Sequence, residues 1–156
     1  MKSTTSPVTL REITANTVIA VISLSVTERQ EAFVASNAVS LAQALFAPEA
    51  WYRAIYFGEE LVGFVMLEAL PSLAPPQPEI GVWRFMIDAK FQRRGIGRNA
   101  LLQVIEHVRK KGLFTRLQLS YFPGPGCPER FYISLGFRHT GRMDEDEIIL
   151  ELPFDE

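Results

Sequence analysis

The stretch of sequence that decides the fold reads Gln92-Arg93-Arg94-Gly95-Ile96-Gly97-Arg98. It lies between a strand-like run and an amphipathic helix pattern. Two glycines let the backbone approach a ligand closely, and the free N–H groups of a helix's first turn carry a partial positive charge. Two glycines alone would favour a simple helix start with a close packing contact. The three arginines favour instead an anion site that cradles a pyrophosphate.

The helix that follows this stretch is the clearest in the chain. Its apolar positions recur at helical spacing, and they are Ile96, Ala100, Leu101, Val104, Ile105 and Val108. Gly112 is a good helix terminator, and Lys110 and Lys111 suit the negative end of the helix dipole. The pattern puts His107 on the exposed side of the helix, where we assign it no role.

The remaining pattern predicts a mixed α/β domain with helices on both faces of a sheet. Strand-like runs occupy residues 8–13, 52–57, 61–69, 80–87, 117–121, 137–142 and 147–152. Further helices are expected from a cap at 14–16 to about Ser25, as two short segments within 27–47 broken near Asn37, and from Pro128 to Leu135. The proline-rich residues 71–78 are expected to form a loop. The order β-α-α-β-β-β-α-β-α-β-β implies locally parallel pairing around the central strand–helix–strand unit.

Length and composition restrict the class of protein. The 156 residues suffice for one domain, expected at 8–156 after a flexible N-terminus at 1–7. With 16 basic and 18 acidic residues the net charge is -2, which argues against a general nucleic-acid binder. One cysteine excludes an internal disulfide, and two histidines make a Cys/His zinc site hard to assemble. Without a signal-peptide core or a bilayer-length apolar run, we expect a cytoplasmic protein with no membrane partner and no metal.

A second interpretation of the glycine stretch is a dinucleotide-binding fingerprint, because Gly95 to Ala100 fits G-x-G-x-x-A. That motif requires an acidic residue about 20 positions further on to hold a ribose. No Asp or Glu occurs between Glu106 and Glu129. The stretch also follows the fourth expected strand, which leaves too little chain for a doubly wound sheet. We therefore reject this interpretation.

Two motifs resemble the GNAT superfamily of N-acetyltransferases. Its signature Q/R-x-x-G-x-G/A stands at residues 92–97, and its later Y-x-x-L-G-F motif stands at Tyr132 to Phe137. The resemblance implies the GNAT fold, an α/β architecture with a mixed, mostly antiparallel sheet of about seven strands. Segments at Gln30, 33–35, Asn37, Ser40 and 83–88 further resemble the bacterial diamine and polyamine (spermine/spermidine) acetyltransferases.

The resemblance implies acetyl-CoA as co-substrate. The backbone amides from Gln92 to Arg98 would hold its pyrophosphate. The backbone of Phe85, Met86 and Ile87 would pair with the pantetheine arm like an added strand; without the resemblance these three would simply be core strand residues. In the superfamily the fourth and fifth strands splay apart to admit that arm, and an N–H of the fourth strand polarises the thioester carbonyl.

Tyr132 resembles the superfamily's general acid, whose hydroxyl protonates the departing thiolate. A tyrosine packed at a helix end is the alternative. Relatives often carry an asparagine shortly before this tyrosine, where it contacts the coenzyme. Here that position is Pro125, which has neither a side-chain donor nor a backbone N–H. The departure leaves open both the coenzyme contacts at 123–128 and the placement of Tyr132.

The acceptor side is expected to bind a cationic amine. Glu28 and Glu31 are three residues apart and share one face of a helix, although a solvated helix face explains either one singly. By resemblance, Asn37, Trp83 and Arg84 are further candidates for substrate binding, with sheet packing the alternative for Trp83. The candidates for the general base are Glu28, Glu31, Glu68 and Glu79.

The leading functional hypothesis is transfer of acetyl from acetyl-CoA to a primary amine of a small polyamine or diamine, by direct attack in a ternary complex. One alternative keeps the chemistry and changes the acceptor to a protein N-terminus, a lysine or an aminoglycoside. Another is a non-catalytic module that binds acyl-CoA. Dimers are common among the acetyltransferases that the chain resembles, so a homodimer is one possible state. No feature of the sequence specifies it.

Overall fold

The computed structural model describes residues 7–31, 33–70 and 79–154. The described strands form one seven-stranded sheet in the order β1-β2-β3-β4-β5-β7-β6. They are β1 (Val8–Arg11), β2 (Trp51–Phe57), β3 (Glu60–Leu70), β4 (Glu79–Ile87), β5 (Arg116–Tyr121), β6 (Arg138–Asp144) and β7 (Glu147–Pro153). The helices are α1 (Val18–Ile22), α2 (Glu28–Glu31), α3 (Asn37–Ala44), α4 (Ile96–Lys111) and α5 (Glu129–Ser134), with a 3₁₀ turn, η1 (Ala89–Phe91). The loop predicted at 71–78 lies outside the described residues.

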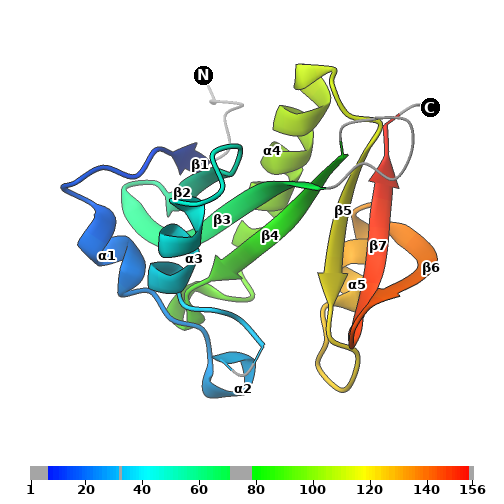
Figure 1. The fold of residues 1–156 in the computed structure, drawn as a ribbon. Coiled ribbons are helices and arrows are strands. Elements are labelled where there is room, and N and C mark those ends of the chain that lie inside the picture. The colour runs from blue at the N-terminus through cyan, green and yellow to red at the C-terminus, as the bar shows by residue number, and fades with distance from the viewer. Residues whose placement is uncertain (1–6, 32, 71–78, 155–156) are drawn as a thin grey trace, which may run out of the picture.

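The pairing of the strands confirms the predicted mixed sheet. All neighbouring strands are antiparallel except β4 and β5, which are parallel. A parallel pair needs a crossover, and α4 supplies it. The β4–β5 pairing covers only Ile80 with Leu117 and Gly81 with Gln118. Beyond these residues the two strands diverge and leave an open wedge in the sheet (Figure 1).

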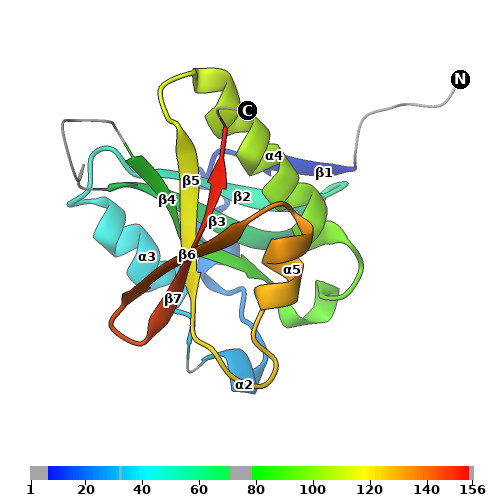
Figure 2. The same cartoon turned by 90° about the vertical axis from the view of Figure 1, so that its right-hand side faces the viewer.

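Helices cover both faces of the sheet (Figure 2). On one face α4 and α5 enclose the larger core, which contains Val65 and Leu117. On the other face α1 and α3 enclose a smaller core around Val21, Phe64 and Met66. Strands β2, β3 and β4 therefore bury side chains on both of their faces.

Helix α4 matches its prediction closely. All six predicted apolar positions are buried, and Gly112 ends the helix in the left-handed conformation with φ of 65°. The prediction for His107 was wrong. Its ring is half-buried and stacks on Trp51, with ring centroids 4.3 Å apart, because Trp51 of β2 packs beside the apolar stripe of the helix. Burial lowers the pKa of His107, and the nearby Lys111 and Arg53 lower it further.

The helices before β2 are short. Helix α1 begins at Val18 rather than directly after 14–16, because Thr14 to Thr17 form a turn in which the Thr14 carbonyl accepts from the Val18 N–H. Two helices occur within 27–47, as predicted, but Asn37 begins the second of them. Ser36 caps that helix, with its Oγ accepting from the Val39 N–H at 3.2 Å.

Candidate active site

Where β4 and β5 diverge, one edge of β4 is left without a strand partner among the described residues. Strand β5 pairs with β7 along its whole length, whereas β4 beyond Gly81 pairs only with β3. The backbone of β4 from Val82 to Ile87 therefore has a strand neighbour on one side only. Such an edge can accept an extended ligand as an added strand.

A β-bulge lies in β4 where the wedge begins to open. Met66 of β3 pairs with Arg84, and Leu67 pairs with Val82, so Trp83 is an extra residue in β4. A bulge leaves its extra residue outside the ladder and bends the strand locally. The bulge therefore redirects the backbone of β4 beside the open edge.

The turn between η1 and α4 presents a run of free backbone donors. Within the described residues, no hydrogen bond uses the backbone N–H groups from Gln92 to Arg98 as donors. Gly95 is the N-cap of α4 and has φ of 80°, a conformation that costs a non-glycine residue energy. Arg93 also adopts a positive φ, of 65°. Free donors gathered at a helix N-terminus fit the oxygens of a phosphate group.

The three arginines of this turn have different surroundings. Arg93 and Arg94 are exposed, and the Arg94 guanidinium lies 5.6 Å from the centroid of the Phe91 ring. Arg98 donates from Nη1 to Oγ of Ser134 at 3.1 Å. Because Ser134 belongs to α5, this bond connects the turn with the helix that carries Tyr132.

Two polar side chains fasten this turn to the segment that contains α2. The Gln92 Nε2 donates to the Ile87 carbonyl at 2.8 Å and to Oε1 of Gln30 at 2.9 Å. The Asp88 carboxylate is only 6% exposed and accepts from the N–H groups of Ser25 and Lys90, each at 3.0 Å. Asp88 had no expected role beyond its place in the resembling segment 83–88. Its only signal was an acidic residue directly before a short turn, which is typical of a helix cap.

Tyr132 lies on α5 among other aromatic rings. Its ring centroid is 5.5 Å from that of Phe131, 6.1 Å from that of Phe137 and 6.4 Å from that of Tyr121. Burial raises the pKa of Tyr132 to about 12. No described residue makes a hydrogen bond to its hydroxyl. The phenol is therefore protonated at neutral pH and free to donate.

The segment before α5 folds as a tight turn. The Cys127 N–H donates to the Gly124 carbonyl at 3.1 Å, and Gly126 has φ of 81°. Pro128 is the N-cap of α5 rather than a residue of its first turn, and its carbonyl accepts from the Tyr132 N–H. The segment thus delivers Tyr132 onto a short helix despite the proline at position 125.

The predicted acceptor residues separate into two groups. Glu28 and Glu31 are exposed on α2, and Glu31 lines a pocket of about 270 Å³ together with Asn37 and Met86. The side chain of Asn37 is 2% exposed and donates from Nδ2 to the Val21 carbonyl at 2.9 Å. Asn37 therefore also joins α3 to α1.

Trp83 and Arg84 form the second group and lie on β4, before Met86 in the strand. Arg84 donates to the Trp83 carbonyl at 3.0 Å and to Oε1 of Gln43 on α3 at 2.9 Å. At the outer end of the wedge, Phe33 after α2 meets Phe122 after β5, with ring centroids 5.2 Å apart. This aromatic contact joins the two halves of the sheet across the opening.

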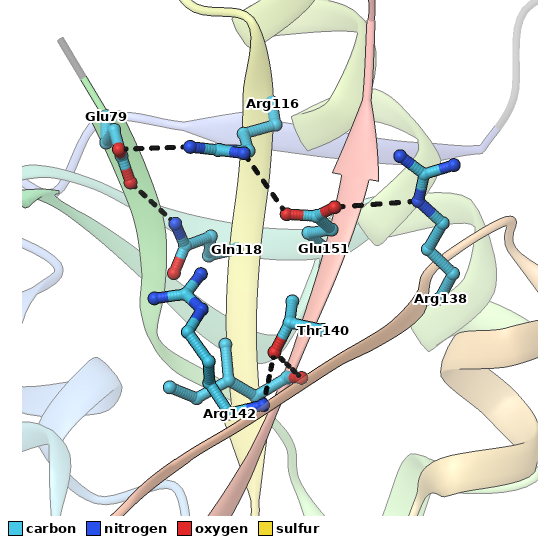
Figure 3. Close-up of polar contacts among 8 residues, drawn as sticks. Glu79, Arg116, Gln118, Arg138, Thr140, Arg142 and Glu151 are labelled. Atoms are coloured by element: carbon cyan, nitrogen blue, oxygen red, sulfur yellow. Dashed lines mark hydrogen bonds and ion pairs between the residues drawn. The ribbon is translucent and has the colours of Figure 1, made fainter. Parts of the chain in front are cut away.

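Glu79, one of the candidate bases, is engaged in a polar network at the closed end of the wedge (Figure 3). It is 5% exposed, accepts from Gln118 Nε2 at 2.6 Å, and pairs with Arg116 at 3.2 Å. Arg116 also contacts Glu151 on β7, and Glu151 contacts Arg138 on β6, each at 3.5 Å. This network fastens four strands together where β4 and β5 are still paired.

The described residues lack two features that other protein classes show. None of the helices there is long and apolar enough to cross a membrane. No group of three or more His, Cys, Asp or Glu side chains in that part of the chain is arranged to hold a metal ion.

Comparison with known proteins agrees with the fold. The model of the acetyltransferase (GNAT) family matches residues 20–137. The chain therefore belongs to the GNAT family of acetyltransferases, whose members use acetyl-CoA as co-substrate. Both motifs that suggested this family, at 92–97 and 132–137, lie within the matched residues.

Individual proteins resemble this chain at low sequence identity. The chain is 27% identical over 139 residues to the spermine/spermidine N(1)-acetyltransferase of Bacillus subtilis strain 168, covering 88% of this chain and 91% of that protein. Among solved structures, the ribosomal-protein-S18-alanine N-acetyltransferase of Escherichia coli superposes with a TM-score of 0.71 at 18% identity, covering 96% and 95% of the two chains. The PaiA N-acetyltransferase of Thermoplasma acidophilum in complex with coenzyme A superposes with a TM-score of 0.68 at 15% identity, covering 94% of this chain and 98% of that chain. These two structures share the fold.

Proposed function

We propose that this acetyltransferase acetylates a primary amine of a small polyamine or diamine, by direct attack within a complex that holds both substrates. The observation that carries the proposal is a carboxylate-bearing acceptor side next to the open edge of β4, where Glu31 and Glu68 have no ion-pair partner among the described residues. The likeness to a spermine/spermidine acetyltransferase over 88% of the chain supports this substrate class.

The residues of the wedge fit acetyl-CoA, which supplies an activated acetyl thioester when bound. The free N–H groups from Gln92 to Arg98 would bind the pyrophosphate, with Arg93 and Arg94 adding charge. The edge of β4 over Phe85, Met86 and Ile87 would pair with the pantetheine arm. These contacts use backbone atoms, so the buried side chains of Met86 and Ile87 remain in the core.

Tyr132 would act as the general acid. Its phenol holds its proton well above neutral pH because burial raises its pKa to about 12, and it would give that proton to the departing thiolate. The bond between Arg98 and Ser134 would keep its helix next to the pyrophosphate turn. The bulge at Trp83 would aim a backbone N–H of β4 at the reacting carbonyl oxygen.

The acceptor enters as an ammonium and must lose a proton before it can attack. Of the four candidate bases, Glu79 is already bound to Arg116 and Gln118. Glu28 and Glu31 are exposed on α2, and we favour Glu31 because it lines the pocket beside Met86. Replacing it by glutamine should lower kcat and shift the acid limb of the pH–rate profile, whereas Glu28→Gln should leave both unchanged.

The test is an acetyl-transfer screen over an amine panel, with release of free thiol as the signal. Spermidine, spermine and putrescine should give acetyl-CoA-dependent product, identified by mass spectrometry, at rates well above those with an N-terminal peptide, a lysine peptide or an aminoglycoside. Turnover confined to a peptide or an aminoglycoside would overturn the acceptor assignment. Tight coenzyme binding with no turnover on any amine would indicate a binding module instead.

A further inference from the structure

A second pocket lies on the α3 side of β4, directly beside the bulge. It has a volume of about 250 Å³ and is lined by the loop of residues 47–50, by Glu68 and Ala69 of β3, and by Trp83. Trp83 is the extra residue of the β4 bulge, so the pocket begins where the wedge opens. This volume leaves room for one arm of a small amine.

Two carboxylates of this pocket lack a hydrogen-bond or ion-pair partner among the described residues. Glu68 is half-buried, Glu49 is exposed, and within the described residues neither makes a hydrogen bond or ion pair. Burial raises the pKa of Glu68, the Arg84 guanidinium lowers it and Asp144 raises it further. A partly desolvated carboxylate without a partner is unfavourable, and a cationic ligand would relieve that cost.

Arg84, the cation that acts on Glu68, makes its hydrogen bonds to other groups. Arg84 donates to Gln43 and to the Trp83 carbonyl rather than to Glu68, and its guanidinium lies 5.4 Å from the Trp83 ring centroid. The carboxylates of Glu49, Glu68 and Asp144 outnumber the Arg84 guanidinium, so this region carries a net negative charge. An ammonium group would reduce that charge, and the Trp83 ring would add a cation–π contact.

Building on the proposed function, we propose that this pocket binds the non-reacting ammonium of the acceptor, with Glu68 as its principal partner and Glu49 and Trp83 as supporting contacts. The reacting amine would then lie at the bulge, one short methylene chain away. The pocket would thus select diamines and polyamines over monoamines. Glu68 is on this account a residue of acceptor specificity and not the base.

The experiment compares putrescine with butylamine, which has the same four-carbon chain and no second ammonium. In Glu68→Gln, kcat/KM for putrescine should fall about tenfold, the lower end of what a charge-assisted hydrogen bond contributes. The value for butylamine and the KM for acetyl-CoA should stay unchanged. The matched control is Glu60→Gln, an exposed glutamate at the other end of β3, which should alter neither amine.

Two results would overturn this assignment. An equal loss of kcat for both amines, with a changed pH profile, would make Glu68 the base; no loss for either would leave it without a role. If the enzyme acetylates neither amine, the proposed function fails, and putrescine titration without acetyl-CoA tests the pocket on its own. The pocket then predicts a change in tryptophan emission that is lost in Trp83→Phe and weakened in Glu68→Gln, and an unresponsive wild type would refute it.

Discussion

The proposed coenzyme side and the proposed acceptor side of the wedge offer a ligand different kinds of atoms. The turn at 92–98 and the open edge of β4 present backbone N–H and C=O groups, held in place by Gly95 and by the sheet register. The acceptor side presents side chains, namely Glu31, Glu68 and Trp83, from three separate elements. Backbone donors need only a particular chain path, so many sequences can supply them. Side-chain contacts depend on residue identity, so they can change the acceptor while the coenzyme site persists.

The largest expected effect concerns Tyr132, the proposed general acid. Tyr132→Phe should lower kcat by roughly 10² to 10⁴, the usual contribution of a general acid. The KM for acetyl-CoA should stay nearly constant, because the ring contacts with Phe131 and Phe137 remain. Steady-state kinetics with Tyr52→Phe as the control measures this. Undiminished kcat in Tyr132→Phe would show that proton donation does not limit the reaction or comes from elsewhere.

Asp88 tests whether the two sides are independent. Asp88→Ala leaves the N–H groups of Ser25 and Lys90 without their acceptor, which should cost about 1–3 kcal/mol of unfolding free energy. Because this carboxylate fastens the turn to the segment before α2, the KM values for acetyl-CoA and for the amine should both rise. Urea unfolding and kinetics measure the two effects, with exposed Asp146→Ala as the control. A change in only one KM would mean that Asp88 does not couple the sides.

Gly95 tests whether a change in the proposed coenzyme site leaves amine binding unaffected. Alanine at φ of 80° should cost about 1–2 kcal/mol of stability and weaken coenzyme binding, while the amine KM stays constant. Gly112→Ala is the matched control, because Gly112 also has a positive φ, of 65°, an added Cβ there would have no atom within 4 Å, and it lies at the opposite end of α4. Calorimetric titration with CoA separates the variants. Equal CoA affinity in Gly95→Ala and wild type would argue against the turn as the pyrophosphate site.

The smallest effect is the response of stability to alkaline pH. Burial raises the pKa of Tyr132 from its ordinary value of 10.0 to about 12, so the folded state binds the phenolic proton more tightly than the unfolded state. Stability is fully present below pH 10 and should fall as pH rises toward 12. Tyr132→Phe should show a shallower decline in unfolding free energy over this interval. Identical slopes would mean that the phenol is not buried in solution.

The sequence predicted local features well and tertiary ones poorly. Helix α4 and its glycine turn were predictable because the spacing of apolar residues and the glycines of a turn are local properties of consecutive residues. The bulge at Trp83 was not, because a bulge is defined by the partner strand. The engagement of Glu79 by Arg116, and of Asp88 by Ser25, joins residues far apart in sequence. The stack of His107 on Trp51 was missed for the same reason.

One measurement tests the division of the site most directly: amide chemical-shift mapping by NMR during separate titrations with CoA and spermidine. The account predicts that CoA shifts the amides of 85–87 and 92–98, and that spermidine shifts amides around Glu31, Glu68 and Trp83. CoA shifts that leave 92–98 unchanged, or spermidine shifts centred on 92–98, would contradict it.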